Sequence, residues 1–544
     1  MKMAELNFPV KGLNEAYSLD DQPKGGFNQQ TGVFGGGTTP RALNVYSYDP
    51  RSGRRRGASR CGTSKYCSVA VNGTRSIQDV MHVVGVQEGS VTRTLEDGTL
   101  RTLENGTFRT LQATSINTGQ RIVSVLAVSG GSVYLITPTS ADLAYNGGGA
   151  LLADSYTIFS QPYQLDIYYC DGTNYRVYDV ASLGVTTWAS AGATPIPPNG
   201  TLICQFNGRI VLAGFKNDPQ NYAMSAVDDA RDWEFAPDTL SDTMAVAGNN
   251  TQGAGLVGDI ITALMPWRDD VMFFGCANSI YRMSGDPAAG GRIDLVSTIT
   301  GVVWGRGFCL SPEGVMYFVG SRGGIYKLDP SGGGVPQRIT ALVVDERFAT
   351  LNMDDNLFRL EWDDRAIGVR IFITPKDGSG TTHYFYDLRN DAWWPETYAT
   401  AAHNPMTIHL LDGYASGDRV MLLGCQDSYI RMVDVDATTD DGDPIESEVW
   451  LGPINNQTLM EMQATFSNDT GNVNWSIHTA SELETALEAN SVGTGRFAAG
   501  RNRSQWPRRH INAGYLRLAS SEPWALEKLV VGVELDSAFR ARRV

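Results

Sequence analysis

The prediction of the fold starts from one segment of this sequence: Val271-Met272-Phe273-Phe274-Gly275-Cys276-Ala277-Asn278-Ser279-Ile280-Tyr281-Arg282-Met283. A similar pattern recurs at residues 315–328 and again at residues 420–432. Each copy has an apolar run, a short glycine-rich or polar turn, and a second run with an aromatic and a basic residue. Such runs around a tight turn are typical of β-hairpins, and a repeated β unit is typical of propellers. The sequence therefore predicts a mainly β protein built around a β-propeller.

The number of blades is estimated from the spacing of the candidate hairpins. They begin near Ile122, Leu165, Ile210, Val271, Val315, Val369 and Val420. A four-stranded propeller blade takes roughly 40 to 50 residues, and loops lengthen some of them. We therefore expect six to eight blades. Residues 77–84 are the candidate for a strand that closes the ring, because closure hides sheet edges that otherwise pair with other chains.

Three regions follow from the changes in pattern along the chain. Residues 1–66 are rich in Gly, Pro, Asn and Arg, show little periodicity, and predict an extended N-terminal assembly arm that gains order by lying on another surface. Residues 67–440 predict the propeller, with a β-ribbon inserted near 86–115, where an eight-residue repeat carries Asp-Gly and Asn-Gly turn signals. Residues 441–544 predict a small C-terminal β-sandwich. Only residues 480–489 have a clear helical pattern.

The charge of the chain is acidic overall but unevenly placed. The net charge is −15, which argues against a protein that reads DNA sequence, since such proteins are normally basic. Basic residues nevertheless gather in three clusters, namely Arg51, Arg54, Arg55, Arg56 and Arg60; Arg501, Arg503, Arg508 and Arg509; and Arg540, Arg542 and Arg543. A run of charge is most often a solvated face.

The cysteines and the hydropathy indicate the cellular context. The seven cysteines are scattered and do not form a disulfide framework, and Cys276 and Cys425 occupy equivalent repeat positions where a small buried side chain is expected. No apolar stretch has the length of a signal peptide or of a transmembrane helix. We expect no membrane segment, and synthesis and folding in a cytoplasm.

No motif in the sequence indicates catalysis. It has no zinc-protease helix, phosphate-binding loop or nucleophile elbow, and its six histidines lack metal-ligand spacing, so we expect no enzyme activity, no metal and no cofactor. Residues 440–443 resemble a calcium loop but lack its distal Glu, which favours a solvated acidic turn. Trp393 and Trp394 would suit a carbohydrate platform, but packing between sheets is the favoured interpretation.

Both ends of the chain resemble one protein family. The N-terminal residues that carry the resemblance are 8–14, 21–23, 38–40, 43–45, 48–50, 52–54, 56–57, 60 and 62–63. The C-terminal residues are Arg509, the run Gly514-Tyr515-Leu516-Arg517-Leu518 and the run Trp524-Ala525-Leu526-Glu527. Their order resembles tail hub or nozzle proteins, also called tail tubular proteins, of short-tailed bacteriophages. Cys61 stands where that family usually has Pro, and the middle of the chain matches only as a generic propeller.

The resemblance implies a structural protein of the virion tail that is made in the host cytoplasm. It implies a homohexameric ring below the portal and its head–tail adaptor, with tail fibres or tail tip proteins as further partners. Genomic DNA would pass through the bore without sequence-specific binding, and the ring would retain the genome and conduct it during ejection. We expect carboxylates to line the bore. We expect assembly contacts from Arg51, Arg54, Arg55, Arg56, Arg60, Arg508 and Arg509.

Two other functions stay open at this point. A carbohydrate-binding or glycoside-hydrolysing propeller would need paired carboxylates a few ångströms apart on one substrate, and the candidates are Asp269-Asp270 and Asp363-Asp364. A cytoplasmic propeller that serves as a scaffold for protein partners is the other alternative.

Overall fold

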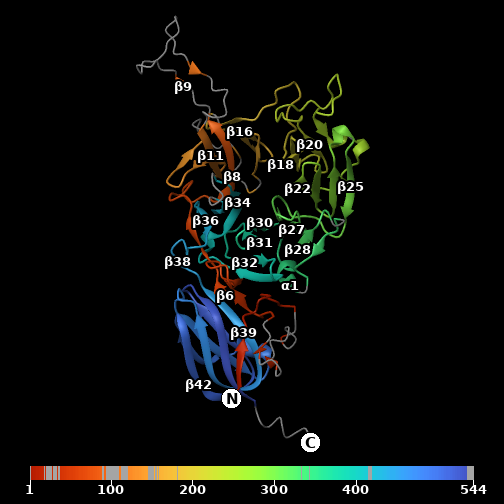
Figure 1. Cartoon of the computed structure of the whole chain (residues 1–544). Helices are drawn as coiled ribbons and strands as arrows, with labels where there is room; N and C mark the ends of the chain where they lie inside the picture. The colour runs from red at the N-terminus through yellow and green to blue at the C-terminus, as the bar shows by residue number, and fades with distance from the viewer. Residues whose placement is uncertain are drawn as a thin grey trace. The chain divides into compact units, whose positions relative to one another are not determined.

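The computed structural model describes residues 2–535, apart from residues 17–18, 20–26, 29–32, 35–36, 88–90, 93–109, 112–119, 145–151, 153–155, 157, 181, 251, 332–333, 342 and 414–418. The described chain is mainly β, and its central part is a seven-bladed β-propeller (Figure 1). The predicted fold class is confirmed, and the blade count lies in the middle of the expected range.

Six of the blades are four-stranded antiparallel sheets whose strands follow the order of the chain. The first blade contains β8 (Ile77–Gln87), β11 (Gln120–Ser129), β12 (Ser132–Ile136) and β13 (Ala141–Leu143). The second contains β14 (Phe159–Tyr163), β15 (Asp166–Cys170), β16 (Tyr175–Asp179) and β17 (Gly184–Thr187). The third contains β18 (Leu202–Phe206), β19 (Arg209–Ala213), β20 (Tyr222–Met224) and β21 (Val246–Ala247).

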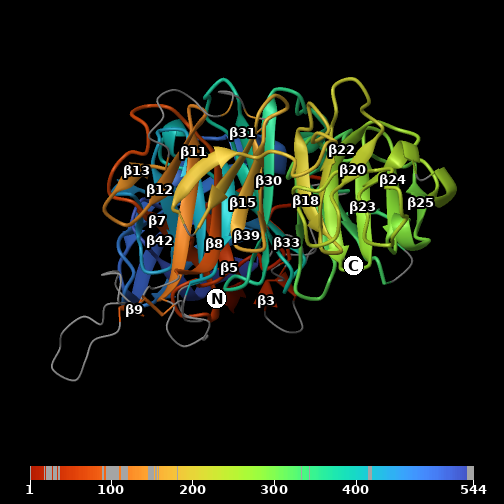
Figure 2. The same ribbon diagram turned by 90° about the horizontal axis from the view of Figure 1, so that it is seen from above.

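The next three blades repeat the pattern. The fourth contains β22 (Ile261–Arg268), β23 (Val271–Cys276), β24 (Ile280–Ser284) and β25 (Arg292–Ser297), which lie side by side in Figure 2. The fifth contains β26 (Phe308–Leu310), β27 (Met316–Val319), β28 (Ile325–Leu328) and β29 (Gln337–Arg338). The sixth contains β30 (Asn356–Asp363), β31 (Gly368–Pro375), β32 (His383–Asp387) and β33 (Ala392–Glu396). The second strand of every blade begins within two residues of a predicted hairpin start.

The seventh blade borrows its fourth strand from the N-terminal part of the chain. Its sheet runs through β34 (Pro405–Leu411), β35 (Val420–Cys425), β36 (Ile430–Asp434), β7 (Gly62–Lys65), β37 (Thr439–Asp440) and β38 (Asp443–Pro444). β7 pairs antiparallel with β36, with Thr63 opposite Val433. The expectation that residues 77–84 close the ring is wrong: they form β8, the first strand of the first blade, and β7 completes the last one.

The C-terminal strands form one continuous hydrogen-bonded sheet that includes N-terminal strands. It contains β39 (Ser447–Phe466), β40 (Val473–Ala480), β41 (Ser491–Phe497), β42 (Gly500–Ser520) and β43 (Ala525–Leu535). The N-terminal strands joined to it are β1 (Lys2–Leu6), β2 (Phe27–Asn28), β3 (Val33–Phe34), β4 (Ala42–Leu43), β5 (Val45–Tyr48) and β6 (Arg55–Ser59). Shifts in register within β39 interrupt its long ladder with β42. Such irregularities bend a sheet, so that its apolar residues enclose a core.

The remaining elements are short. The helices are α1 (Asp345–Ala349), α2 (Leu483–Glu488) and the single turns η1 (Gly248–Asn250), η2 (Gln252–Ala254), η3 (Pro287–Ala289) and η4 (Ala401–His403). α2 lies inside the one predicted helical segment. β9 (Val91–Thr92) pairs antiparallel with β10 (Thr110–Leu111), at the two ends of the eight-residue repeat. The rest of the predicted ribbon lies outside the described residues.

The chain forms two compact units. One contains residues 1–65, 299–405 and 431–544, and the other contains residues 66–298 and 406–430. In the first unit, residues of the N-terminal segment share a core with the sixth blade and the C-terminal sheet; its members include Phe8, Tyr46, Trp394, Leu516 and Trp524. The described residues of the segment predicted to be an arm thus pack on other parts of their own chain.

Candidate assembly interface

The first arginine cluster begins at a loop that Asp49 organises. Asp49 Oδ1 accepts a hydrogen bond from the backbone N–H of Arg51 at 3.0 Å, and Oδ2 accepts from Arg56 Nε at 3.0 Å. Burial alone would raise the pKa of Asp49, but hydrogen bonds from Ser52 and Arg56 outweigh burial and hold the pKa below its usual range. The loop between β5 and β6 is therefore built around an ionised carboxylate.

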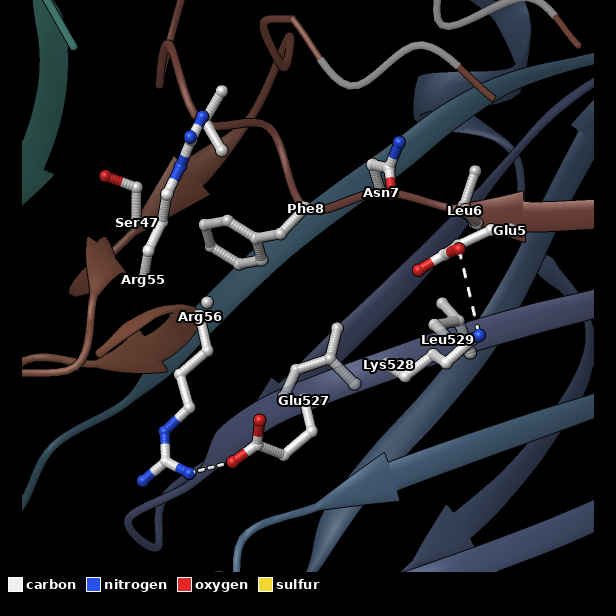
Figure 3. Close-up of a pocket in the computed structure, with 13 residues that line it drawn as sticks. Glu5, Leu6, Asn7, Phe8, Ser47, Arg55, Arg56, Glu527, Lys528 and Leu529 are labelled. Carbon is white, nitrogen blue, oxygen red and sulfur yellow. Dashed lines mark hydrogen bonds and ion pairs between the residues drawn. The ribbon is translucent and has the colours of Figure 1, made fainter. Parts of the chain in front are cut away.

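Arg56 also joins this loop to the C-terminal sheet. Its guanidinium forms an ion pair with Glu527 on β43, and Figure 3 shows the two side chains pointing toward each other. Arg54 is much more exposed and lies 3.9 Å from the same carboxylate. The backbone follows the same path, because Gly57 pairs with Leu526 between β6 and β43.

A groove of about 290 Å³ runs beside these residues (Figure 3). Its lining combines apolar side chains with charges of both signs: Glu5, Leu6, Asn7, Phe8, Val10, Ser47, Arg55, Arg56, Gly57, Leu526, Glu527, Lys528 and Leu529. Arg55 is exposed, and among the described residues no side-chain hydrogen bond or ion pair holds it. Arg54 and Arg55 are therefore the arginines of this cluster that face outward.

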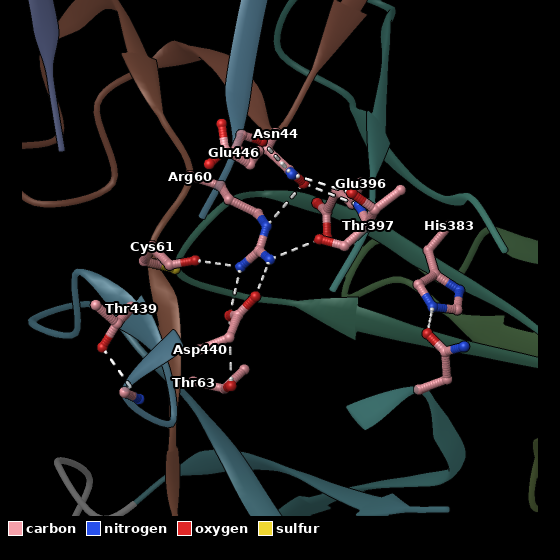
Figure 4. A network of polar contacts seen from close by, with 12 residues as sticks. Asn44, Arg60, Cys61, Thr63, His383, Glu396, Thr397, Thr439, Asp440 and Glu446 are labelled. Carbon is pink, nitrogen blue, oxygen red and sulfur yellow. Dashed lines mark hydrogen bonds and ion pairs between the residues drawn. The ribbon is translucent and has the colours of Figure 1, made fainter. Parts of the chain in front are cut away.

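Arg60 has a different role, because it is only 3 % exposed and all its donors are used within the chain (Figure 4). Its Nη1 donates to Asp440 Oδ1 at 2.9 Å, and its Nε donates to Asn44 Oδ1 at 2.9 Å. Its Nη2 donates to the backbone carbonyl of Thr397 at 2.8 Å. Arg60 therefore anchors the N-terminal segment to the sixth blade and to β37.

Asp440 shows that one expectation from sequence is wrong. We expected residues 440–443 to form a solvated acidic turn, but Asp440 is fully buried against Arg60. Asp441 pairs with the buried Arg431 at 2.9 Å. A carboxylate that balances a buried cation is retained in the interior, because an unpaired charge there would be very costly.

A second buried network surrounds Arg370 in the sixth blade. Arg370 Nε donates to Asp363 at 2.7 Å, and Nη1 lies 3.3 Å from Glu396, which accepts a hydrogen bond from Tyr46. Burial would raise the pKa of Asp363, but the Arg370 charge and backbone N–H groups lower it. Asp363 is thus held as a structural carboxylate, whereas Asp364, Asp269 and Asp270 are exposed.

The other predicted residues fall in several places. Arg51 lies in the Asp49 loop, half-buried, with Nε and Nη2 lacking a hydrogen-bond partner. Arg508 and Arg509 belong to β42, but their side chains lie outside the described residues, as does the whole cluster at 540–543.

Trp393 and Trp394 are at most 1 % exposed, which confirms the packing interpretation. Cys276 and Cys425 end equivalent strands and are fully buried, as expected.

Sequence reasoning missed the partners of the arginines. Asp440 and Glu527 are far along the chain from Arg60 and Arg56, the arginines with which they pair, so no local sequence signal links them. Only Asp49 lies close in sequence to its partner, Arg56. Across the described residues, no group of three or more His, Cys, Asp or Glu side chains is arranged to hold a metal ion. In the same part of the chain, no helix has the length and apolar character needed to cross a membrane.

Comparisons with known proteins found solved structures with low similarity to this chain and no relative by sequence. No family model and no curated protein matches the chain. The extracellular domain of a hybrid two component system from B. thetaiotaomicron is 10 % identical, over 87 % of this chain and 59 % of that one, at a TM-score of 0.43. The Dos1 propeller is 9 % identical, over 70 % of this chain and 97 % of that one, at a TM-score of 0.36. The match covers 59 % of that two component system domain and 44 % of the extracellular domain of a one component system from B. thetaiotaomicron, so this chain spans about half the length of these two structures.

Proposed function

We propose that this protein is a virion structural component that forms a hub or nozzle ring in the tail of a short-tailed bacteriophage. One observation carries the proposal: the two ends of the chain that resemble this family interlock. The Phe8 and Trp524 rings lie 6.5 Å apart, and Ala58 pairs with Ala525 between β6 and β43. The Arg56–Glu527 ion pair joins the same two segments. Residues that resemble one family at opposite chain ends thus form one packed unit.

Contacts within the chain limit which arginines are available for assembly in this proposal. Arg56 and Arg60 are used inside the chain, whereas Arg54 and Arg55 are exposed beside the groove at β1, β6 and β43. Exposed charges contribute mainly to the rate and the specificity of association, because they attract a partner of opposite sign. We propose that Arg54 and Arg55 contact an acidic surface of a neighbouring subunit or of the head–tail adaptor.

The overall charge agrees with a conduit for DNA. With a net charge of −15, the chain repels phosphate wherever its carboxylates face the bore. A bore of the same sign as DNA offers few attachment points, so the genome passes without sequence-specific binding. The hexameric state, the adaptor, portal and tail-fibre contacts, and the role in retaining and ejecting the genome all belong to this proposal.

The test is the mass of the purified protein by light scattering and negative-stain imaging, alone and mixed with the portal and adaptor proteins from the same genome. We expect a ring of six copies, either alone or on the adaptor. A double variant, Arg54→Glu with Arg55→Glu, should assemble less than wild type. The control is Lys216→Glu with Lys11→Glu, which makes the same change of charge at exposed sites and should assemble as wild type does. A protein that stays monomeric with every component would refute the proposal.

A further inference from the structure

The third blade contains a pocket that the assembly proposal does not use. It has a volume of about 240 Å³ and opens beside the outer strands β20 and β21 (Figure 2 labels β20). Ala223 and Ala247 pair across these two strands and both line the pocket. Because both side chains are small, the space above the strands stays open. Phe215, Phe235, Pro197 and Pro198 supply apolar walls.

The polar part of the lining consists of three carboxamides and one carboxylate, from Asn199, Asn217, Asn221 and Asp218. The Asn221 side chain accepts the backbone N–H of Tyr222 at 3.0 Å, and Asp218 accepts from Asn249 at 2.8 Å. No hydrogen bond to the rest of the described chain holds the side-chain amides of Asn199 and Asn217. A carboxamide offers two donors and an acceptor, so these groups are free to bind a ligand.

The composition of the lining excludes several classes of ligand. It has no Lys or Arg, and its one charged side chain is Asp218. A phosphate or carboxylate ligand would meet a negative charge without a compensating cation, which disfavours nucleotides and acidic sugars. Ligand pockets for larger molecules have volumes of about 300 to 1,000 Å³, so this one accommodates a single small ring.

We propose that this pocket binds one neutral pyranose sugar. The ring would place its C–H face against Phe215, Phe235 and the prolines, and its hydroxyls toward Asn199, Asn217 and Asp218. Hydroxyls both donate and accept, which matches carboxamides together with a carboxylate. The pattern of an apolar wall with a few polar groups at its edge is that of small-molecule sites in general. The inference holds whether or not the protein is a tail component.

The test is titration of the full chain with neutral monosaccharides, followed by isothermal calorimetry and by saturation-transfer NMR. We expect saturable binding of at least one hexose. Asn217→Ala removes an exposed amide and should weaken binding about fivefold, the effect of losing one hydrogen bond. Ala247→Leu should block the pocket. Lys216 is the exposed neighbour of Asn217 and does not line the pocket. The Lys216→Ala variant should therefore bind sugar as wild type does.

Three outcomes would overturn the inference. One is the absence of saturable binding by wild type across the hexose panel. Another is binding of a nucleoside such as adenosine while no sugar binds. The third is sugar binding that both Asn217→Ala and Ala247→Leu leave unchanged, since the sugar would then bind elsewhere. Circular dichroism of each variant establishes that the fold is retained, and Asn217→Ala provides the test if Ala247→Leu does not fold.

Discussion

The Arg60 guanidinium donates from Nη1 to Oδ1 of Asp440 at 2.9 Å, across 380 residues of sequence. Asp440 is fully buried and Arg60 almost so. Nη2 also donates to Oδ2 of Asp440, and Asn44 and the backbone carbonyls of Cys61 and Thr397 accept the other three donors of the guanidinium. One side chain therefore ties together the N-terminal segment, the end of the sixth blade and the extension of the seventh.

Removing one member of this pair should be strongly destabilising. We expect Arg60→Ala or Asp440→Ala to lower the free energy of unfolding by about 3–5 kcal/mol, because the partner is left as an uncompensated buried charge. Arg54→Ala, in the same cluster but exposed, should change it by less than about 1 kcal/mol. Urea unfolding followed by tryptophan fluorescence measures all three variants. Equal effects of Arg60→Ala and Arg54→Ala would contradict this interpretation.

The stability of the sixth blade should depend on pH through His383. Its Nδ1 accepts the Ile373 backbone N–H at 3.1 Å, and its Nε2 faces Asn404 Oδ1 at 3.0 Å, so the ring is held neutral. Burial lowers the pKa of His383 to about 4, against 6.5 for a free histidine. The unfolded chain thus binds the proton first, and stability is lost as the pH falls from about 6.5 toward 4.

The complete loss of the His383 contribution lowers the free energy of unfolding by about 3 kcal/mol. Chemical unfolding between about pH 7 and pH 5 measures about half of this change while most carboxylates stay ionised. His383→Gln should flatten the dependence, whereas His510→Gln, on an exposed histidine, should leave it unchanged. A dependence that is the same in His383→Gln and in wild type would show that another group titrates.

Packing of the N-terminal segment should depend on Phe8. Its ring lies 5.7 Å from that of Trp394 and 6.5 Å from that of Trp524, and the absence of a Cβ at Gly57 makes room for it. We expect Phe8→Ala to lower the free energy of unfolding by about 3–5 kcal/mol. Limited proteolysis should then cut within residues 2–16 faster than in wild type. Lys11→Ala, on an exposed side chain of the same segment, is the control and should be cut at the wild-type rate.

Completion of the seventh blade should require glycine at position 62. A Cβ built there would lie 1.9 Å from the backbone oxygen of Thr439, which cannot move without displacing β37. We expect Gly62→Ala to lower the thermal midpoint and to cost about 1–3 kcal/mol. Gly192→Ala meets no atom within 4 Å and should be nearly neutral. Differential scanning calorimetry compares the two; similar midpoints would mean that β7 shifts at little cost.

The repeated hairpins were predictable because their determinants are local. An apolar run, a tight turn and a second run lie within about a dozen residues, so periodicity alone places them. The burial of Trp393 and Trp394 also followed from their place in a blade, where aromatic side chains pack between sheets. The arginine cluster is visible in the sequence, but which of its members are buried and paired is not, since Arg55 and Arg60 look alike in sequence.

The propeller, its approximate number of blades and the all-β C-terminal region follow from the sequence alone, because each depends on patterns that repeat over short distances. That β7 completes the last blade and that Asp440 is buried can be seen only in the folded chain. The same holds for the arginines, because Arg56 and Arg60 pair within the chain whereas Arg54 and Arg55 face outward. These features join residues hundreds of positions apart. A charged residue carries the same letter in either setting, and only the fold brings its counter-ion within reach.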